Sequence, residues 1–147
     1  MTRTRICIVG AGRVGRLHTG NLLRRVADRA DVVAICDPNL EAAQKLAGDF
    51  GVRATFPSLR EALQVAAFDG AVITTPTFTH RDEAVTALEA GISIHLEKPM
   101  AMNLIECHAI TAAADRSGAA VQLGFMRRFD QDFIDAAAML SGGEIGT

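Results

Sequence analysis

The chain has 147 residues, 49% of them hydrophobic and 22% charged, which are the proportions of an ordinary globular domain. These proportions exclude a disordered chain, a collagen and a long coiled coil, and a domain of this length buries about two-thirds of its surface without disulfides or metals. The 15 basic and 17 acidic residues leave a net charge of −2, and Trp and Tyr are absent. A nucleic-acid partner is therefore not expected, because such proteins carry a basic excess and aromatic stacking surfaces.

No apolar run reaches the ~18 residues that span a bilayer, so we expect no membrane partner. The basic start, residues 1–5, leads into an apolar run that is too short for a secretory signal. Cys7, Cys36 and Cys107 are odd in number and lack the spacing of metal ligands. They predict buried, reduced thiols in a cytoplasmic protein and no metal site.

Short β-branched runs alternate with helical patterns along the whole chain. The expected strands span residues 5–9, 32–36, 52–55, 71–74, 92–96 and 121–124. The expected helices span residues 14–27, 40–50, a short segment from 59, 80–90, 104–116 and 131–141. This alternation predicts an α/β fold with a doubly wound parallel sheet of six strands and helices on both faces, the Rossmann arrangement.

Capping residues support several of the expected helix starts. Ser58 precedes Glu61, and Asn103 precedes Glu106, at the spacing of a capping box. Thr79 and Asp130 are expected to be the N-caps of the helices that follow them.

A glycine-rich turn, Gly10-Ala-Gly12-Arg13-Val14-Gly15, joins the first strand to the first helix. In a dinucleotide-binding fold the first glycine permits the tight turn, the second lets the backbone approach a pyrophosphate, and the third packs helix on strand. The free N–H groups of the helix N-terminus favour the same anion. The turn predicts dinucleotide binding; a purely structural glycine turn and an S-adenosylmethionine enzyme are the alternatives. Arg13 either reaches the pyrophosphate or is a solvated loop arginine.

Asp37 closes the second strand, at about the 20-residue distance from the glycine turn that a ribose-binding carboxylate occupies. Such a carboxylate accepts hydrogen bonds from the ribose hydroxyls and repels a 2′-phosphate. Pro38 and Asn39 supply no cation for that phosphate. NAD is therefore favoured over NADP; the alternative is that Asp37 only caps the turn before the second helix.

Polar clusters follow the fourth, fifth and sixth strands, at the edge where open parallel sheets bind ligands. They are residues 74–80, 97–99 and 124–130. A charged pair such as Glu97-Lys98 directly after a buried strand is costly unless it serves a ligand or partner. The alternative is a solvated loop pair.

Other conspicuous side chains have simpler explanations. His95, inside the fifth strand, is expected to be a hydrogen-bonded core histidine. His18 and His108 fall within helices and are expected to be surface or packing residues. The spacing of Phe125, Phe129 and Phe133 predicts one packed helix face.

Taken together, the glycine turn, the segment from Thr74 to His80 and above all Glu97-Lys98-Pro99 resemble the Gfo/Idh/MocA family of NAD(P)-dependent dehydrogenases. Residues 124–130 are similar to the corresponding segment of the inositol 2-dehydrogenases in that family. The resemblance implies that Lys98 lies beside the nicotinamide and the substrate hydroxyl, as catalytic and substrate-binding residue. It implies further contacts near the nicotinamide and active site from Thr75, Pro76, Thr77, His80, Glu97, Met126 and Arg127. Many members carry Asn where Thr77 stands, and Arg127 is the implied substrate contact.

The same resemblance divides the chain into an NAD(P)-binding domain over residues 1–142 and, over 143–147, the start of a connection to a second α/β domain. That second domain supplies the proton-accepting histidine in the family, so residues 1–147 alone are expected to bind NAD without turning over a substrate. The implied function is NAD-dependent oxidation of a ring hydroxyl of a cyclic polyol or sugar, such as inositol, by a homo-oligomeric enzyme. The alternative is a non-catalytic nucleotide-binding module that acts as redox sensor or assembly subunit.

Overall fold

Six parallel strands form a single sheet at the centre of the computed structural model, which describes residues 2–144. The strands are β1 (Thr4–Val9), β2 (Ala30–Cys36), β3 (Ala54–Phe56), β4 (Gly70–Ile73), β5 (Ser93–Leu96) and β6 (Val121–Leu123). Their order across the sheet is β3-β2-β1-β4-β5-β6, and every neighbouring pair is parallel. The predicted fold is confirmed, with strand ends that move by one to two residues.

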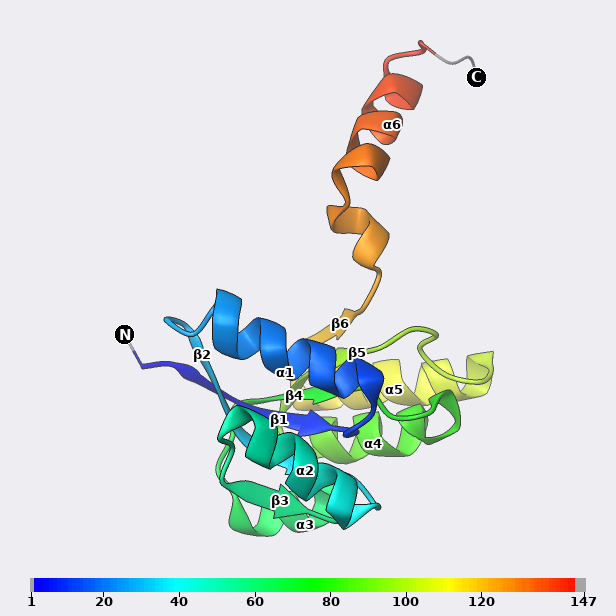
Figure 1. Cartoon of the computed structure of the whole chain (residues 1–147). Helices are drawn as coiled ribbons and strands as arrows, with labels where there is room; N and C mark the ends of the chain where they lie inside the picture. Colours follow the sequence, from blue (N-terminus) through cyan, green and yellow to red (C-terminus); the bar gives the residue numbers. More distant parts are fainter. Residues whose placement is uncertain (1, 145–147) are drawn as a thin grey trace.

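Helices cover both faces of this sheet (Figure 1). The covering helices are α1 (Arg13–Arg25), α2 (Leu40–Phe50), α3 (Leu59–Val65), α4 (Thr77–Glu89) and α5 (Leu104–Ser117). The 3₁₀ turn η1 (Met126–Phe129) and helix α6 (Gln131–Ser141) follow β6 and lie off the sheet. In the part of the chain that the structure describes, no helix is long and apolar enough to cross a membrane.

Two hydrophobic cores, one on each face, follow from the alternation of side chains along the strands. On one face Ile8 of β1 packs with Ile35 of β2 and Leu46 of α2. On the other, Cys7 and Val9 of β1 pack with residues of α3, α4 and α5. Because the crossovers leave β1 and β4 toward opposite faces, the carboxyl ends of these two strands border a crevice, where ligands bind in such sheets.

Helix starts follow the capping pattern with one correction. The Ser58 and Asn103 side chains accept hydrogen bonds from the backbone N–H groups of Glu61 at 3.2 Å and Glu106 at 3.0 Å, as predicted. The expectation that Thr79 caps its helix is wrong, because α4 already begins at Thr77 with Pro76 as its N-cap. Asp130 occupies the N-cap position of α6, but its side chain makes no capping hydrogen bond.

The three C-terminal phenylalanines do not form the packed helix face that their spacing predicts. Phe125, Phe129 and Phe133 are 52%, 72% and 52% exposed. They belong to a loop, to η1 and to α6, so helical periodicity does not apply across them. Figure 1 shows α6 projecting away from the sheet, which explains why none of its side chains is buried.

Two of the three cysteines are buried thiols, as predicted. Cys7 and Cys36 lie on adjacent strands with their Sγ atoms 3.5 Å apart. The hydrogen bond with Cys36, and then burial, raise the pKa of Cys7 well above its ordinary value. Cys107, on α5, is partly exposed.

Candidate functional site

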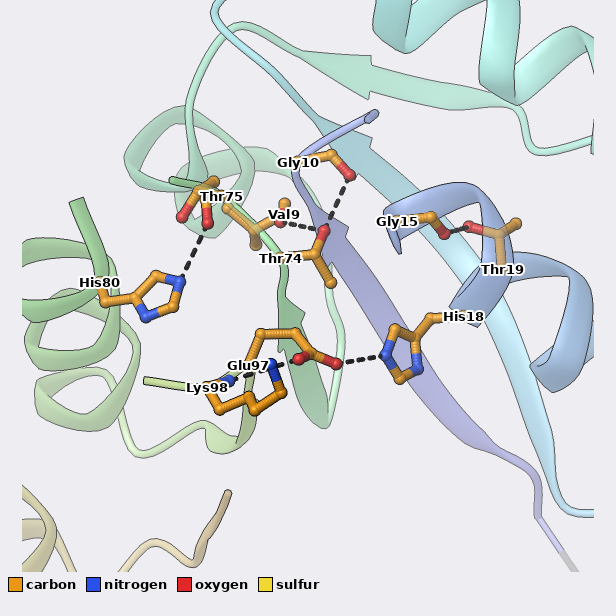
Figure 2. A network of polar contacts seen from close by, with 10 residues as sticks. All are labelled: Val9, Gly10, Gly15, His18, Thr19, Thr74, Thr75, His80, Glu97 and Lys98. Atoms are coloured by element: carbon orange, nitrogen blue, oxygen red, sulfur yellow. Dashed lines mark hydrogen bonds and ion pairs between the residues drawn. The ribbon is translucent and has the colours of Figure 1, made fainter. Parts of the chain in front are cut away.

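The glycine turn is packed against the end of β4 and could not carry side chains at two of its positions. Gly10 has a φ of +105°, and a Cβ on it would lie 2.8 Å from Thr74 Oγ1. A Cβ on Gly15 would lie 1.9 Å from the carbonyl oxygen of Gly10. The Thr74 hydroxyl, 3.1 Å from the carbonyl oxygens of both Val9 and Gly10, holds the turn from below (Figure 2).

Gly12 differs from these two glycines, because a Cβ added to it would meet nothing within 4 Å. Gly12 is the N-cap of α1, makes no side-chain cap and is followed by a first turn without acidic residues. Arg13 is exposed beside it and Val14 is half-buried. The open side of Gly12 and the uncapped N–H groups of α1 fit an anionic pyrophosphate, so the residues present suit a dinucleotide.

Asp37 lies at the end of β2, directly beside the glycine turn. Its Oδ2 accepts a hydrogen bond from the N–H of Ala11 at 2.8 Å, and its Oδ1 accepts one from the N–H of Asn39 at 2.8 Å. The carboxylate therefore braces both the glycine turn and the turn before α2. Each oxygen keeps acceptor capacity for a further donor, because an ionised carboxylate offers about four lone-pair sites.

His80 joins the loop after β4 to the loop after β5. The residue is 1% exposed, and its Nδ1 lies 2.9 Å from the carbonyl oxygen of Pro99. Its Nε2 lies 2.9 Å from the carbonyl oxygen of Thr75 (Figure 2). Both partners are acceptors, so both contacts are hydrogen bonds only when both ring nitrogens carry a proton. His80 therefore acts on the site through the two backbone segments that it holds together.

Glu97, at the end of β5, meets His18 from α1, which sequence reasoning left among surface or packing residues. His18 Nε2 lies 3.0 Å from Glu97 Oε1, and the backbone N–H of Lys98 donates to Glu97 Oε2 at 3.3 Å. Burial raises the pKa of Glu97, but the hydrogen bonds from His18 and Lys98 outweigh it, and the pKa lies below its ordinary value. The carboxylate is therefore ionised at neutral pH.

Gly124 leaves the space that this carboxylate fills. A Cβ on Gly124 would lie 3.2 Å from the Cδ and Oε1 atoms of Glu97. The sequence position of His18 indicates that it faces the sheet, because it follows Gly15 by three residues and so shares the helix face of that glycine. Gly124 offered a weaker signal, as a glycine directly after a strand.

His95 corrects a further expectation. Its Nε2 atom is buried and has no hydrogen-bond partner within residues 2–144, so it is not a satisfied core histidine. Its ring centroid lies 5.0 Å from that of His18, and the two planes are tilted by 57°. Burial, and then the nearby His18, lower the pKa of His95 and outweigh Glu97 and the side chain of Gln122 on the neighbouring strand, which raise it.

Lys98 is exposed and lines a hollow of about 310 Å³ together with Phe125, Met126 and Arg127. A cis peptide bond joins it to Pro99. Arg127 is held by its own segment: Nη1 donates to Asp130 at 2.8 Å, and the guanidinium lies 4.8 Å from the centre of the Phe133 ring. The structure thus gathers the predicted Lys98, Met126 and Arg127 at one hollow. Thr75 and Pro76 belong to the loop after β4, and Thr77 and His80 lie in the first turns of α4.

A six-stranded sheet of this order, with a glycine turn under an uncapped helix N-terminus, defines a dinucleotide-binding domain of the Rossmann type. Over residues 4–125 the sequence matches the Gfo/Idh/MocA family, described as an oxidoreductase family with an NAD-binding Rossmann fold. The chain belongs to this family, and the domain is of the NAD-binding kind.

Known relatives agree with this assignment. The chain is 35% identical over 144 residues to a scyllo-inositol 2-dehydrogenase (NAD(+)) from Bacillus subtilis, covering 98% of this chain and 42% of that protein. It superposes with a TM-score of 0.91 and 27% identity on scyllo-inositol dehydrogenase from Lactobacillus casei with bound NAD(H) and scyllo-inositol, covering 99% of this chain and 43% of that one.

A third relative binds a different sugar compound. The WlbA dehydrogenase from Bordetella pertussis, in complex with NADH and UDP-GlcNAcA, is 30% identical with a TM-score of 0.93. The match covers 99% of this chain and 44% of that one. The chain thus spans somewhat under half the length of the relatives it matches.

Proposed function

We propose that this chain is the cofactor-binding part of an NAD-dependent dehydrogenase that oxidises a ring hydroxyl of a cyclic polyol or sugar, with inositol as the first candidate. The observation that carries the proposal is the position of Lys98. Its exposed amine lies at the carboxyl edge of the sheet, in a hollow with Met126 and Arg127. A domain that only bound a nucleotide would need neither this cation nor the ionised carboxylate of Glu97 next to it.

The cofactor would be held by Gly12, the N-terminus of α1 and Asp37, which all have free space or free hydrogen-bonding groups. The pyrophosphate would bind over Gly12 and the N-terminus of α1, with Gly10 and Gly15 keeping the turn in shape and Arg13 beside it. Asp37 would accept hydrogen bonds from the adenosine ribose. Since Pro38 and Asn39 provide no cation for a 2′-phosphate, we favour NAD over NADP. The bound cofactor would supply the hydride acceptor.

Lys98 would act on the substrate hydroxyl. An ammonium group donates hydrogen bonds and stabilises the negative charge that develops on the hydroxyl oxygen as its proton leaves. Glu97, which contacts His18 and fills the space left open by Gly124, would orient the groups around the nicotinamide. His80, by fixing the carbonyl of Pro99, would keep the backbone of Lys98 in place.

The substrate class follows from what the relatives bind, read together with the hollow. One relative holds scyllo-inositol and another UDP-GlcNAcA, and both are hydroxylated rings. Arg127 and Met126 border the hollow and are the side chains we propose to contact the ring. The proton acceptor is expected from a second domain, as in the family, so the reaction is proposed for the complete enzyme.

The direct test is NADH formation by the full-length protein with saturating NAD and, in separate reactions, myo-inositol, scyllo-inositol and a UDP-sugar acid. We expect turnover with at least one of the inositols, and we expect residues 1–147 alone to bind NADH without turnover. Tight NADH binding with no turnover on any hydroxylated ring would overturn the dehydrogenase assignment in favour of a nucleotide-binding module.

A further inference from the structure

We propose that His18, His95 and Glu97 form a binding site for a divalent transition-metal ion, with Zn²⁺ as the metal that suits them best. One nitrogen of each histidine and one carboxylate oxygen all lie within 4.8 Å of one another. Two imidazoles and one carboxylate are a donor set that proteins use for zinc when a fourth position is left open. The proposal does not depend on the dehydrogenase function.

The fold brings the three side chains together from two elements. His95 belongs to β5 and Glu97 follows directly at its end, two residues apart, so both point to the same face of the sheet. Helix α1 covers that face and contributes His18, whose Nε2 is already 3.0 Å from Glu97 Oε1. Figure 2 shows the ring of His18 directed at this carboxylate.

An unused ligand atom points to an occupant. The buried Nε2 of His95 has no partner among the described residues, and an unpaired buried polar atom costs about 1–3 kcal/mol. A metal ion would use the lone pair of that imidazole. No hydrogen bond within residues 2–144 does so.

The donor types suit a metal as well. Ligands must be deprotonated, with imidazole neutral and carboxylate ionised, and both groups then present a lone pair at the ligand atom. The nearest fixed cation along the chain is Lys98, whose side chain is exposed.

Small side-chain movements would complete the coordination. Bonds of about 2.0–2.2 Å from Zn²⁺ to nitrogen and oxygen place neighbouring ligand atoms roughly 3.3–3.5 Å apart in a tetrahedron. His18 and Glu97 are already closer than this, and the ligand atom of His95 lies within 4.8 Å of both of theirs. The side chains of His18 and Glu97 keep 25% and 18% of their surface exposed, which gives the ion a path of entry and room for a water ligand.

The experiment is a Zn²⁺ titration of the purified protein in competition with a chromogenic chelator. The variants are His95→Leu and, as matched control, His108→Leu, which changes an exposed histidine on α5. Loss of a mere outer partner of a ligand already costs about 10- to 100-fold in metal affinity, so His95→Leu should cost at least about tenfold. The control should bind like the unmodified protein.

Urea unfolding checks independently that His95→Leu folds. Because leucine replaces an unpaired polar group, the unfolding midpoint of this variant should not fall below that of the unmodified protein. Co²⁺ provides a second readout: ligation by imidazole and carboxylate gives visible bands without the charge-transfer band of a thiolate. Equal Zn²⁺ affinity in the unmodified protein and His95→Leu, or a thiolate band that points to Cys107, would overturn the proposal.

Discussion

His80 Nδ1 lies 2.9 Å from the carbonyl oxygen of Pro99, 19 residues further along the chain. The other ring nitrogen makes the equivalent contact with Thr75. A single buried side chain therefore links the loop after β4 to the loop after β5, which carries Lys98.

Replacing His80 by leucine should destabilise the protein, because the link between the two loops is lost. The Thr75 and Pro99 carbonyl groups would lose their contacts with the imidazole, at least one of which is a hydrogen bond whichever ring nitrogen carries the proton. Leaving a buried polar group without its donor costs about 1–3 kcal/mol. We expect the free energy of unfolding to fall by roughly 1–3 kcal/mol in urea titrations, with His108→Leu as the neutral comparison. A variant as stable as its parent would show that the two carbonyls find other donors.

Gly12 and Gly15 form a matched pair for separating cofactor binding from folding. In Gly12→Ala the new Cβ has free space, so the unfolding midpoint should stay near that of the parent while NADH affinity falls. In Gly15→Ala the Cβ would lie 1.9 Å from a backbone oxygen, so stability should fall by about 3 kcal/mol or more. Thermal unfolding and NADH fluorescence titration measure the two effects; similar results for both variants would contradict this division.

Asp37→Ala should weaken the binding of NADH by roughly 1–3 kcal/mol, the range for a lost hydrogen bond to a charged group. The ratio of NADH affinity to NADPH affinity should fall as well. Calorimetric titration of both cofactors measures this. Because Asp37 also accepts from the N–H groups of Ala11 and Asn39, Asp37→Asn is the needed companion, since its one oxygen retains part of the bracing. Equal affinity for NADH and NADPH in the unmodified protein would refute the preference.

Lys98→Met should lower kcat of the complete enzyme by about 10²-fold or more, the usual contribution of a proton-transfer or electrostatic group. NADH affinity should change little, since the contacts proposed for the pyrophosphate and ribose lie elsewhere. Steady-state assays with inositol and a parallel NADH titration separate the two quantities. Near-normal turnover would show that Lys98 has no catalytic role and that Glu97-Lys98 is a solvated loop pair.

The Arg5–Asp69 ion pair predicts a pH dependence of stability. Hydrogen bonds from the Arg5 side chain and backbone lower the pKa of Asp69 from 3.8 to about 2. The pair therefore contributes its full stability above pH 4, and that contribution disappears as the pH falls toward 2. The difference in urea midpoint between the parent and Asp69→Asn should shrink across this window, whereas the exposed Asp115→Asn should give no such trend.

The sheet, its helices and the glycine turn were predictable because each rests on a local pattern. The alternation of strands with helices, and glycines at fixed spacing after the first strand, require only neighbouring residues. His18 and Glu97 are 79 residues apart and become partners only once α1 packs against the sheet. Nothing local to either residue reveals this contact. The Cys7–Cys36 contact likewise needs the pairing of β1 with β2. The predicted face of Phe125, Phe129 and Phe133 is wrong for the opposite reason: the local spacing fits a helix, but the three residues lie in a loop, in η1 and in α6.

The absence of any buried side chain on α6 has a consequence for hydrogen exchange. Helices shorter than about 12–15 residues are marginally stable in water without tertiary packing, so for residues 1–147 studied alone we expect the amides of α6 to open at little cost in free energy. The amides of β1, which lies between β2 and β4, exchange only through a much larger opening. We therefore expect the last helix and the sheet of residues 1–147 to unfold as separate cooperative units, with the glycine turn equally protected whether α6 is folded or not.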